Sequence, residues 1–140
     1  MSTRRLDSLT VANLAFVVAM ALHGIDHTRQ ARGLEALTRE VRWGGVALAV
    51  VAVGALLLTL RHSPFAPLVA TIVGFGTAIA VTASHLAPHW SALSDPYAEL
   101  GLGLYSWAVV LAEVVTALLL GIAGLVELRR QQRAPARAGF

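Results

Sequence analysis

Polar and apolar residues are strongly segregated along this chain, into long apolar stretches joined by short polar ones. Ser8 to Ile25 contains no Asp, Glu, Lys or Arg, and the same holds for residues 43–60 and 62–94. Residues 100–126 contain one such residue, Glu113. A helix needs roughly 20 mainly apolar residues to cross a bilayer. The pattern therefore predicts four transmembrane helices, over about residues 8–28, 42–60, 65–87 and 101–127.

Short connections between these stretches favour an all-α integral membrane protein, a four-transmembrane-helix up-down bundle. The bundle forms a single domain over residues 1–128, followed by an Arg-rich polar tail at 129–140 that we expect to be disordered. Between the first two helices, apolar Leu34, Leu37 and Val41 alternate with charged residues, which predicts a short interfacial amphipathic helix. Small residues of the second span, such as Gly45 and Gly54, favour close helix packing there.

The amino-acid composition excludes several classes of function. The chain of 140 residues is 56% hydrophobic and 14% charged, against about a quarter charged in soluble domains. It has no cysteine, which excludes thiolate catalysis, disulfide exchange and Cys-based metal sites. All eleven basic residues are arginine, a bias typical of GC-rich bacterial coding. They lie near the ends of the spans, so nucleic-acid binding has no support.

The distribution of arginine also predicts the orientation. Four spans place both termini on one side, which holds seven arginines against four on the other. The positive-inside rule then puts both termini in the cytoplasm of a bacterial inner membrane. Ala19-Met20-Ala21 after an apolar run resembles a signal-peptide cleavage site, but the apolar stretch continues through Ile25, which favours a retained first helix.

Two histidine pairs carry the candidate chemistry. His23 and His27 end the first span, and His85 and His89 end the third. A spacing of four places both members of a pair on one helix face. Because helices 1 and 3 cross in the same direction, both pairs reach the outer leaflet, where Asp26 shares the face of the first pair. His62, on the inner side, is interpreted as an ordinary interface residue.

Glu113 is the one acidic residue of the apolar stretch 100–126. At about 1.5 Å per residue it lies near the bilayer midplane, within reach of His23 directly or through water. A carboxylate at that depth must be protonated, paired or in contact with water. Asp95 and Glu99, in the loop after the third span, could close the site from outside or be solvated charges, and we prefer the second interpretation for both.

The leading interpretation is a transition-metal site with His23, His27, His85, His89 and Asp26 as ligands, since imidazole and carboxylate suit Zn, Cu or Fe. Such a site would serve metal passage, storage or redox chemistry. One alternative is a b-type haem between two helices, for example on His23 and His85. Another is cofactor-free proton transfer on a lipid-soluble substrate, with Glu113 and Asp26 as catalytic groups together with His23. A small accessory subunit and a homo-oligomer with a shared pocket also remain open.

Overall fold

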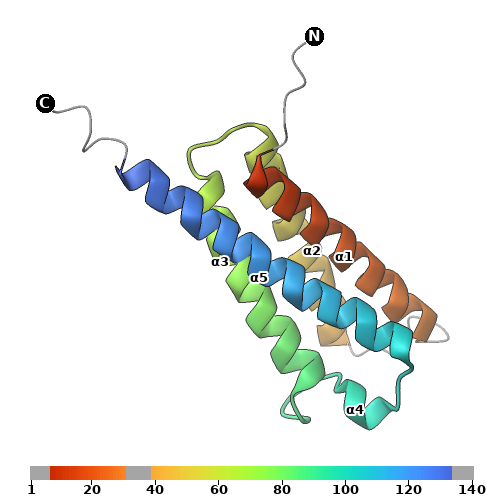
Figure 1. The fold of residues 1–140 in the computed structure, drawn as a ribbon. Coiled ribbons are helices and arrows are strands. Elements are labelled where there is room, and N and C mark those ends of the chain that lie inside the picture. The colour runs from red at the N-terminus through yellow and green to blue at the C-terminus, as the bar shows by residue number, and fades with distance from the viewer. Residues whose placement is uncertain (1–6, 31–38, 134–140) are drawn as a thin grey trace, which may run out of the picture.

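The computed structural model describes residues 7–30 and 39–133, and this part of the chain is helical with no strand. Figure 1 shows the arrangement. The elements are α1 (Ser8–Gln30), α2 (Arg39–Leu60), α3 (Ala66–Val81), the π-helical segment η2 (Thr82–Leu86), α4 (Tyr97–Leu100) and α5 (Leu104–Arg133). Four helices, with η2 extending α3, are long and apolar enough to cross a membrane.

Local sequence explains where these helices begin and end. The Asp7 carboxylate accepts a hydrogen bond from the Thr10 backbone N–H at 2.7 Å and so caps the start of α1. Helix α2 ends where His62 takes a left-handed backbone, with φ of 53°. The backbone N–H groups of His62 and Ser63 then bond the Thr59 and Leu58 carbonyls, the pattern of a Schellman motif. Pro67 stands in the first turn of α3, where its missing N–H costs nothing.

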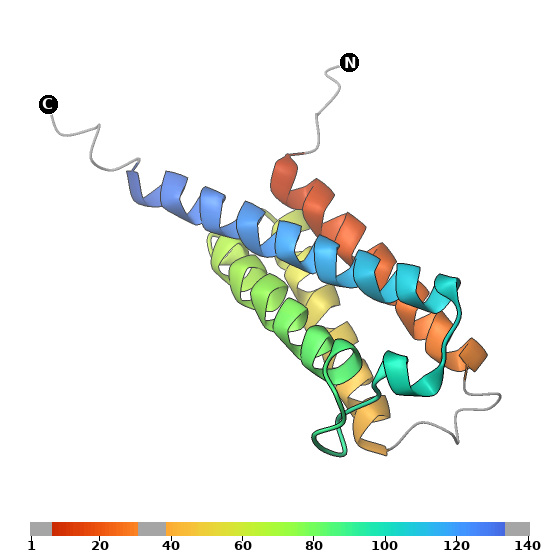
Figure 2. The same cartoon turned by 60° about the horizontal axis from the view of Figure 1, so that its bottom comes forward.

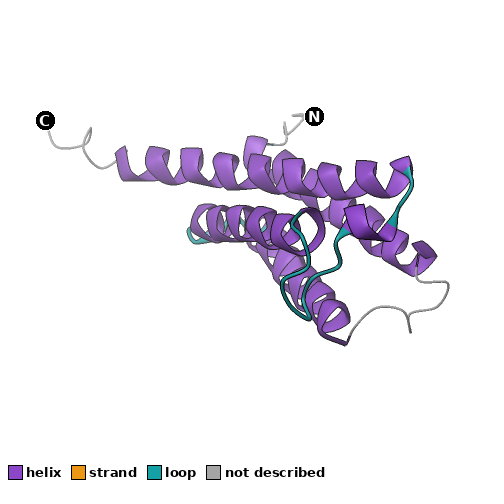
Figure 3. Ribbon diagram, turned by 90° about the horizontal axis from the view of Figure 1, so that it is seen from below, coloured by secondary structure: helices purple, strands orange, loops and turns teal. Residues whose placement is uncertain are grey.

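Helix α5 packs against both α1 and α3, whereas α2 contacts α1 and α3 on the side away from α5 (Figure 3). The α3–α5 contact is the closest. A Cβ added at Gly124 would lie 2.7 Å from the Pro67 carbonyl oxygen, and one at Gly74 would lie 2.6 Å from that of Ala117. Glycine therefore lets the two backbones meet directly.

Polar and apolar side chains are distributed between interior and surface in the opposite way to a soluble protein. Polar side chains are fully buried in the centre, among them Asn13, Ser106 and Glu113. The exposed surface instead carries many large apolar side chains, such as Val18, Ile25 and Ile79. Asn13 donates from Nδ2 to the Thr59 hydroxyl at 2.9 Å, which links α1 to α2. The core is thus polar at several points while the outside is apolar.

The observed elements agree with the four predicted spans and correct several details. Helix α5 continues to Arg133, so the first residues of the expected polar tail are helical. The expected interfacial helix falls mainly within 31–38, outside the described residues, while Arg39 to Arg42 form the first turn of α2. The prediction of close packing through the α2 glycines was wrong, because a Cβ added at Gly45 or Gly54 meets nothing within 4 Å.

Candidate metal centre

Three histidines from two helices meet at one end of the molecule. His23 and His27 come from the last turns of α1, and His85 comes from η2. One ring nitrogen from each lies within 4.8 Å of the other two. The ring centroid of His23 is 4.5 Å from that of His27 and 4.9 Å from that of His85. The end of α1, the end of α3 and the start of α5 gather at this end (Figure 2).

The π-helical segment places His85 in this group. Thr82 to Leu86 winds more widely than an α-helix, and the Ala87 backbone N–H closes the segment on the Thr82 carbonyl at 3.1 Å. Single π turns often occur at functional sites because they turn a side chain out of the α-helical register. Thr82 is exposed while His85 is 6% exposed, so the wide turn buries the imidazole and releases the threonine.

His23 is held at both ring nitrogens. Its Nδ1 contacts the Glu113 Oε2 of α5, and its Nε2 lies 2.8 Å from the Tyr97 hydroxyl of α4. An ionised carboxylate only accepts hydrogen bonds, so Nδ1–H donates to Glu113 and Nε2 accepts from the phenol. This is the arrangement in which a carboxylate fixes the tautomer and direction of an imidazole.

His27 and His85 share a carboxylate neighbour. Asp95 Oδ2 lies 3.6 Å from His27 Nδ1 and 3.7 Å from His85 Nδ1. His85 Nδ1–H donates to the Asp95 backbone carbonyl at 3.1 Å, which leaves its Nε2 lone pair available. Within the described residues, His27 Nδ1 and Asp95 Oδ2 are buried atoms without a hydrogen-bond partner. Two unsatisfied polar atoms at one point are typical of a site that receives a ligand.

Tyr97, the first residue of α4, is fully buried. Its ring lies 4.9 Å from that of His85 and 5.8 Å from that of Trp107. Burial raises the pKa of the Tyr97 phenol above its ordinary value of 10.0. The phenol therefore keeps its proton and donates to His23. Nothing in the spacing around Tyr97 pointed to this position, because the connection from residues 87 to 96 is irregular.

Asp26 lies on the buried side of α1 but outside the histidine group. Its carboxylate accepts from Arg29 Nε at 2.8 Å and also contacts Gln30 Nε2. Arg29 reaches on to the Ser106 hydroxyl at 3.1 Å, and its guanidinium lies 5.0 Å from the centre of the Tyr105 ring. These contacts tie the end of α1 to the start of α5. Besides Glu113, the carboxylate that the structure brings to the histidines is that of Asp95, for which the sequence favoured a solvated position.

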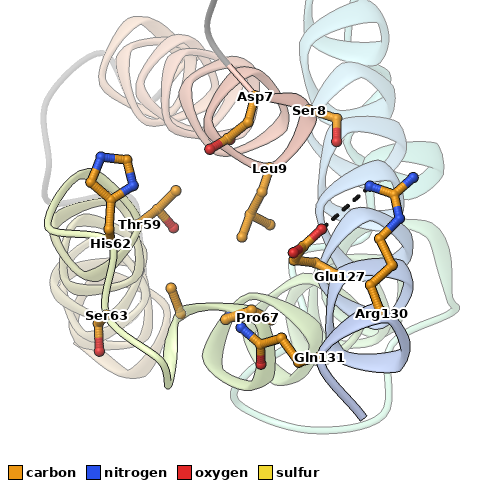
Figure 4. Close-up of a pocket in the computed structure, with 11 residues that line it drawn as sticks. Asp7, Ser8, Leu9, Thr59, His62, Ser63, Pro67, Glu127, Arg130 and Gln131 are labelled. Atoms are coloured by element: carbon orange, nitrogen blue, oxygen red, sulfur yellow. Dashed lines mark hydrogen bonds and ion pairs between the residues drawn. The ribbon is translucent and has the colours of Figure 1, made fainter. Parts of the chain in front are cut away.

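The other two histidines also lie apart from the group. The helix ends at Leu86, and His89 is an exposed residue whose backbone N–H donates to Glu99 at 3.2 Å. His62 lies at the opposite end of the molecule. It lines a cavity of about 240 Å³ together with Asp7, Glu127 and Arg130 (Figure 4).

A larger cavity reaches the histidine group from the side. It has a volume of about 1060 Å³ and lies between α2 on one side and α1 and α3 on the other. Most of its wall is apolar, for example Val17, Val46 and Ile72. His23, His27, His85 and Glu113 contribute polar atoms to the same wall. The histidine group is therefore open to a space much larger than an ion.

No protein-family model, curated protein or solved structure matches this chain. The function must therefore be argued from the geometry of the site. That geometry provides three imidazoles in mutual contact, a carboxylate behind one of them, a second carboxylate between the other two, and an apolar cavity alongside.

Proposed function

We propose that this protein is a membrane-embedded transition-metal protein whose ion is held by His23, His27 and His85. The observation that carries the proposal is the approach of three imidazole ligand atoms to within 4.8 Å of one another. Imidazole nitrogen is a preferred ligand of Zn, Cu and Fe, and three histidines are a common catalytic zinc set.

The apolar exterior supports the insertion of this chain in a bilayer as an up-down four-helix bundle. Exposed apolar side chains cover the outside of all four long helices, and soluble monomers rarely expose contiguous apolar patches on this scale. The start of α1 and the end of α5 lie at one end (Figure 1). The predicted topology assigns seven arginines of the sequence to the side of the termini and four to the other side, so we place the termini in the cytoplasm and the histidines near the outer face.

The surrounding groups fit a bound ion. Glu113 behind His23 gives the carboxylate–histidine pairing that orients a metal ligand and raises its basicity. Asp95 Oδ2 and His27 Nδ1, which lack hydrogen-bond partners, would both be satisfied by coordination. Asp95 is thus our candidate for a fourth ligand. His23 Nε2 would exchange its hydrogen bond to Tyr97 for the metal.

A haem is less compatible with this packing. The His23 and His85 rings are 4.9 Å apart at their centroids and meet edge to face. A macrocycle held between these two axial ligands would need a gap that the touching rings do not leave. A single ion needs no such gap, so the geometry favours an ion over haem b.

The test is elemental analysis of the detergent-purified protein after exposure to Zn, Cu or Fe salts and removal of excess metal. Wild type should retain about one equivalent of one metal, as expected for a single closed group of ligands. His27→Gln and His85→Gln should lose it, whereas His62→Gln and His89→Gln should keep it. Equal metal content in all five proteins would refute the assignment, because His62 and His89 lie outside the group.

A second candidate rests on the unbroken chain from Glu113 through His23 to Tyr97. A carboxylate, an imidazole and a hydroxyl in series resemble the order of groups that activates a nucleophile or moves a proton. This would make the protein a proton-transfer enzyme without a metal. Tyr97→Phe separates the candidates: it frees His23 Nε2 and should preserve metal binding, but it removes the terminal hydroxyl of the chain. Intact metal binding in Tyr97→Phe would favour the metal centre.

A further inference from the structure

The cavity beside the histidines points to a second ligand. We infer that it binds a neutral, lipid-soluble carbonyl compound with an alkyl tail, whose carbonyl accepts a hydrogen bond from Thr77 on the wall that Thr77 shares with the histidines. The inference deepens the proposed function, because it names the class of molecule that would meet the metal centre. It also stands on observations of its own.

The volume and the apolar wall of the cavity indicate that most of the ligand is an apolar chain. Pockets for drug-sized ligands usually measure about 300–1,000 Å³, and this cavity measures about 1060 Å³. Helix α2 contributes a wall of small and branched apolar residues, including Gly44, Gly45, Val46 and Leu48. Because no Cβ or larger group fills the space beside Gly45, the wall leaves room for an alkyl chain. A metal ion alone would need none of this volume.

One buried hydroxyl indicates the chemistry of the polar head group of the ligand. Thr77 of α3 lines the cavity and is 2% exposed, and within the described residues its Oγ1 has no hydrogen-bond partner. Threonines in helices usually donate to the carbonyl four residues earlier, as Thr71 does to Pro67 at 2.8 Å. Thr77 does not, so its hydroxyl hydrogen is free to donate into the cavity. An acceptor such as a carbonyl oxygen satisfies it.

The charges on the cavity wall favour a neutral head. Glu40 and Arg42, from the first turn of α2, both line the cavity and oppose each other in sign. Glu113 accepts a hydrogen bond from His23 Nδ1–H and keeps its negative charge, which disfavours an anionic head. A neutral carbonyl compound accepts from the Thr77 hydroxyl without needing a counter-ion.

Native mass spectrometry of the detergent-purified protein tests the inference and reports bound metal in the same spectrum. The probes are decylubiquinone and decylbenzene, which share an alkyl tail but differ in the carbonyl head. Decylubiquinone should bind saturably at one per chain, and decylbenzene should not. Gly45→Leu should abolish binding by filling the cavity, while Gly54→Leu is the matched control. Gly54 is in the same helix, its added side chain also meets open space, and it does not line the cavity.

Thr77→Val tests the hydrogen bond between the Thr77 hydroxyl and the carbonyl of the ligand. Replacing an unpartnered buried hydroxyl by a methyl group should leave the empty protein equally or more stable, while decylubiquinone binding falls about fivefold. Equal binding of the two probes, binding of neither, or binding unchanged in Gly45→Leu overturns the inference. Metal retained without quinone binding leaves the proposed metal centre standing. Quinone binding without retained metal supports the inferred carbonyl ligand and refutes the proposed metal centre.

Discussion

The two ends of the molecule carry the same kinds of polar groups in opposite settings. Each end has histidine and an acid–arginine pair three residues apart in one helix: Asp26 with Arg29 at the histidine end, Glu127 with Arg130 at the other. The Asp26 side chain is fully buried, whereas that of Glu127 is 38% exposed. Three histidines meet at the first end, while His62 is an exposed residue at the second.

The difference shows that enclosure, and not the residue types, distinguishes the candidate site. A polar group in contact with water exchanges partners at little cost, so its neighbours in a structure reveal little. A buried group must be satisfied by specific partners, and those left unsatisfied call for a ligand. At the histidine end, His27 and Asp95 have such atoms. The predictions below challenge this contrast, from the largest expected effect to the smallest.

Asp95→Ala should weaken metal binding about 10- to 100-fold, the usual effect of removing a carboxylate that supports or completes a metal site. Its Oδ2 lies between His27 and His85 and has no other partner among the described residues. Glu99→Ala is the control from the same connection, since among the described contacts the Glu99 side chain accepts only from the backbone N–H of the exposed His89. Competition with a chromogenic chelator measures both affinities, and equal affinities would remove Asp95 from the site.

Asp26→Ala should lower the free energy of unfolding by about 2 kcal/mol, because Arg29 and Gln30 lose a fully buried partner. Half of Arg29 is exposed, so water recovers part of the loss. Glu127→Ala breaks the corresponding exposed pair and should cost less than about 0.5 kcal/mol. Denaturation in mixed micelles gives both values. Metal content should stay at the wild-type level in Asp26→Ala, and its loss would return Asp26 to the ligand set.

The sequence predicted much of this architecture because long apolar helices leave strong patterns in a sequence. Four apolar stretches predicted four long helices, and the contact between His23 and Glu113 followed from helix rise. The convergence of His23, His27 and His85 followed from two spans that cross in the same direction. These inferences depend on helical periodicity alone, which a single sequence displays directly.

Other features depended on details that periodicity does not contain. His89 shares a face with His85 only if the helix continues, but Pro88 drives Ala87 into an extended backbone, with φ of −83° and ψ of 155°. The choice between Asp26 and Asp95 depended on an irregular connection whose path has no sequence rule. The glycines of α2 and α3 look alike in sequence, and only the packing assigns close contact to Gly74 and open space to Gly45.

Asp7→Ala should cost about 1 kcal/mol of unfolding free energy, because Asp7 caps α1 through the Thr10 N–H. That hydrogen bond lowers the pKa of Asp7 below its ordinary value of 3.8. The contribution is therefore present above this value and is lost as the pH falls through the lower folded-state pKa. Asp7→Asn keeps an accepting oxygen, so it should retain most of the stability and lose this pH dependence. Unfolding measured at neutral and acidic pH tests both variants.

His62→Gly should raise the unfolding free energy by about 0.5–1 kcal/mol, the smallest effect expected. His62 stands at the left-handed position that ends α2, with φ of 53°, where a Cβ is unfavourable and glycine is preferred. Glycine also adds freedom to the unfolded chain, which offsets part of the gain. His62→Ala keeps the strain and should show no gain. If the alanine variant proves more stable than the glycine variant, the backbone at His62 is not strained, whereas a loss in both variants means that the imidazole itself stabilises this end.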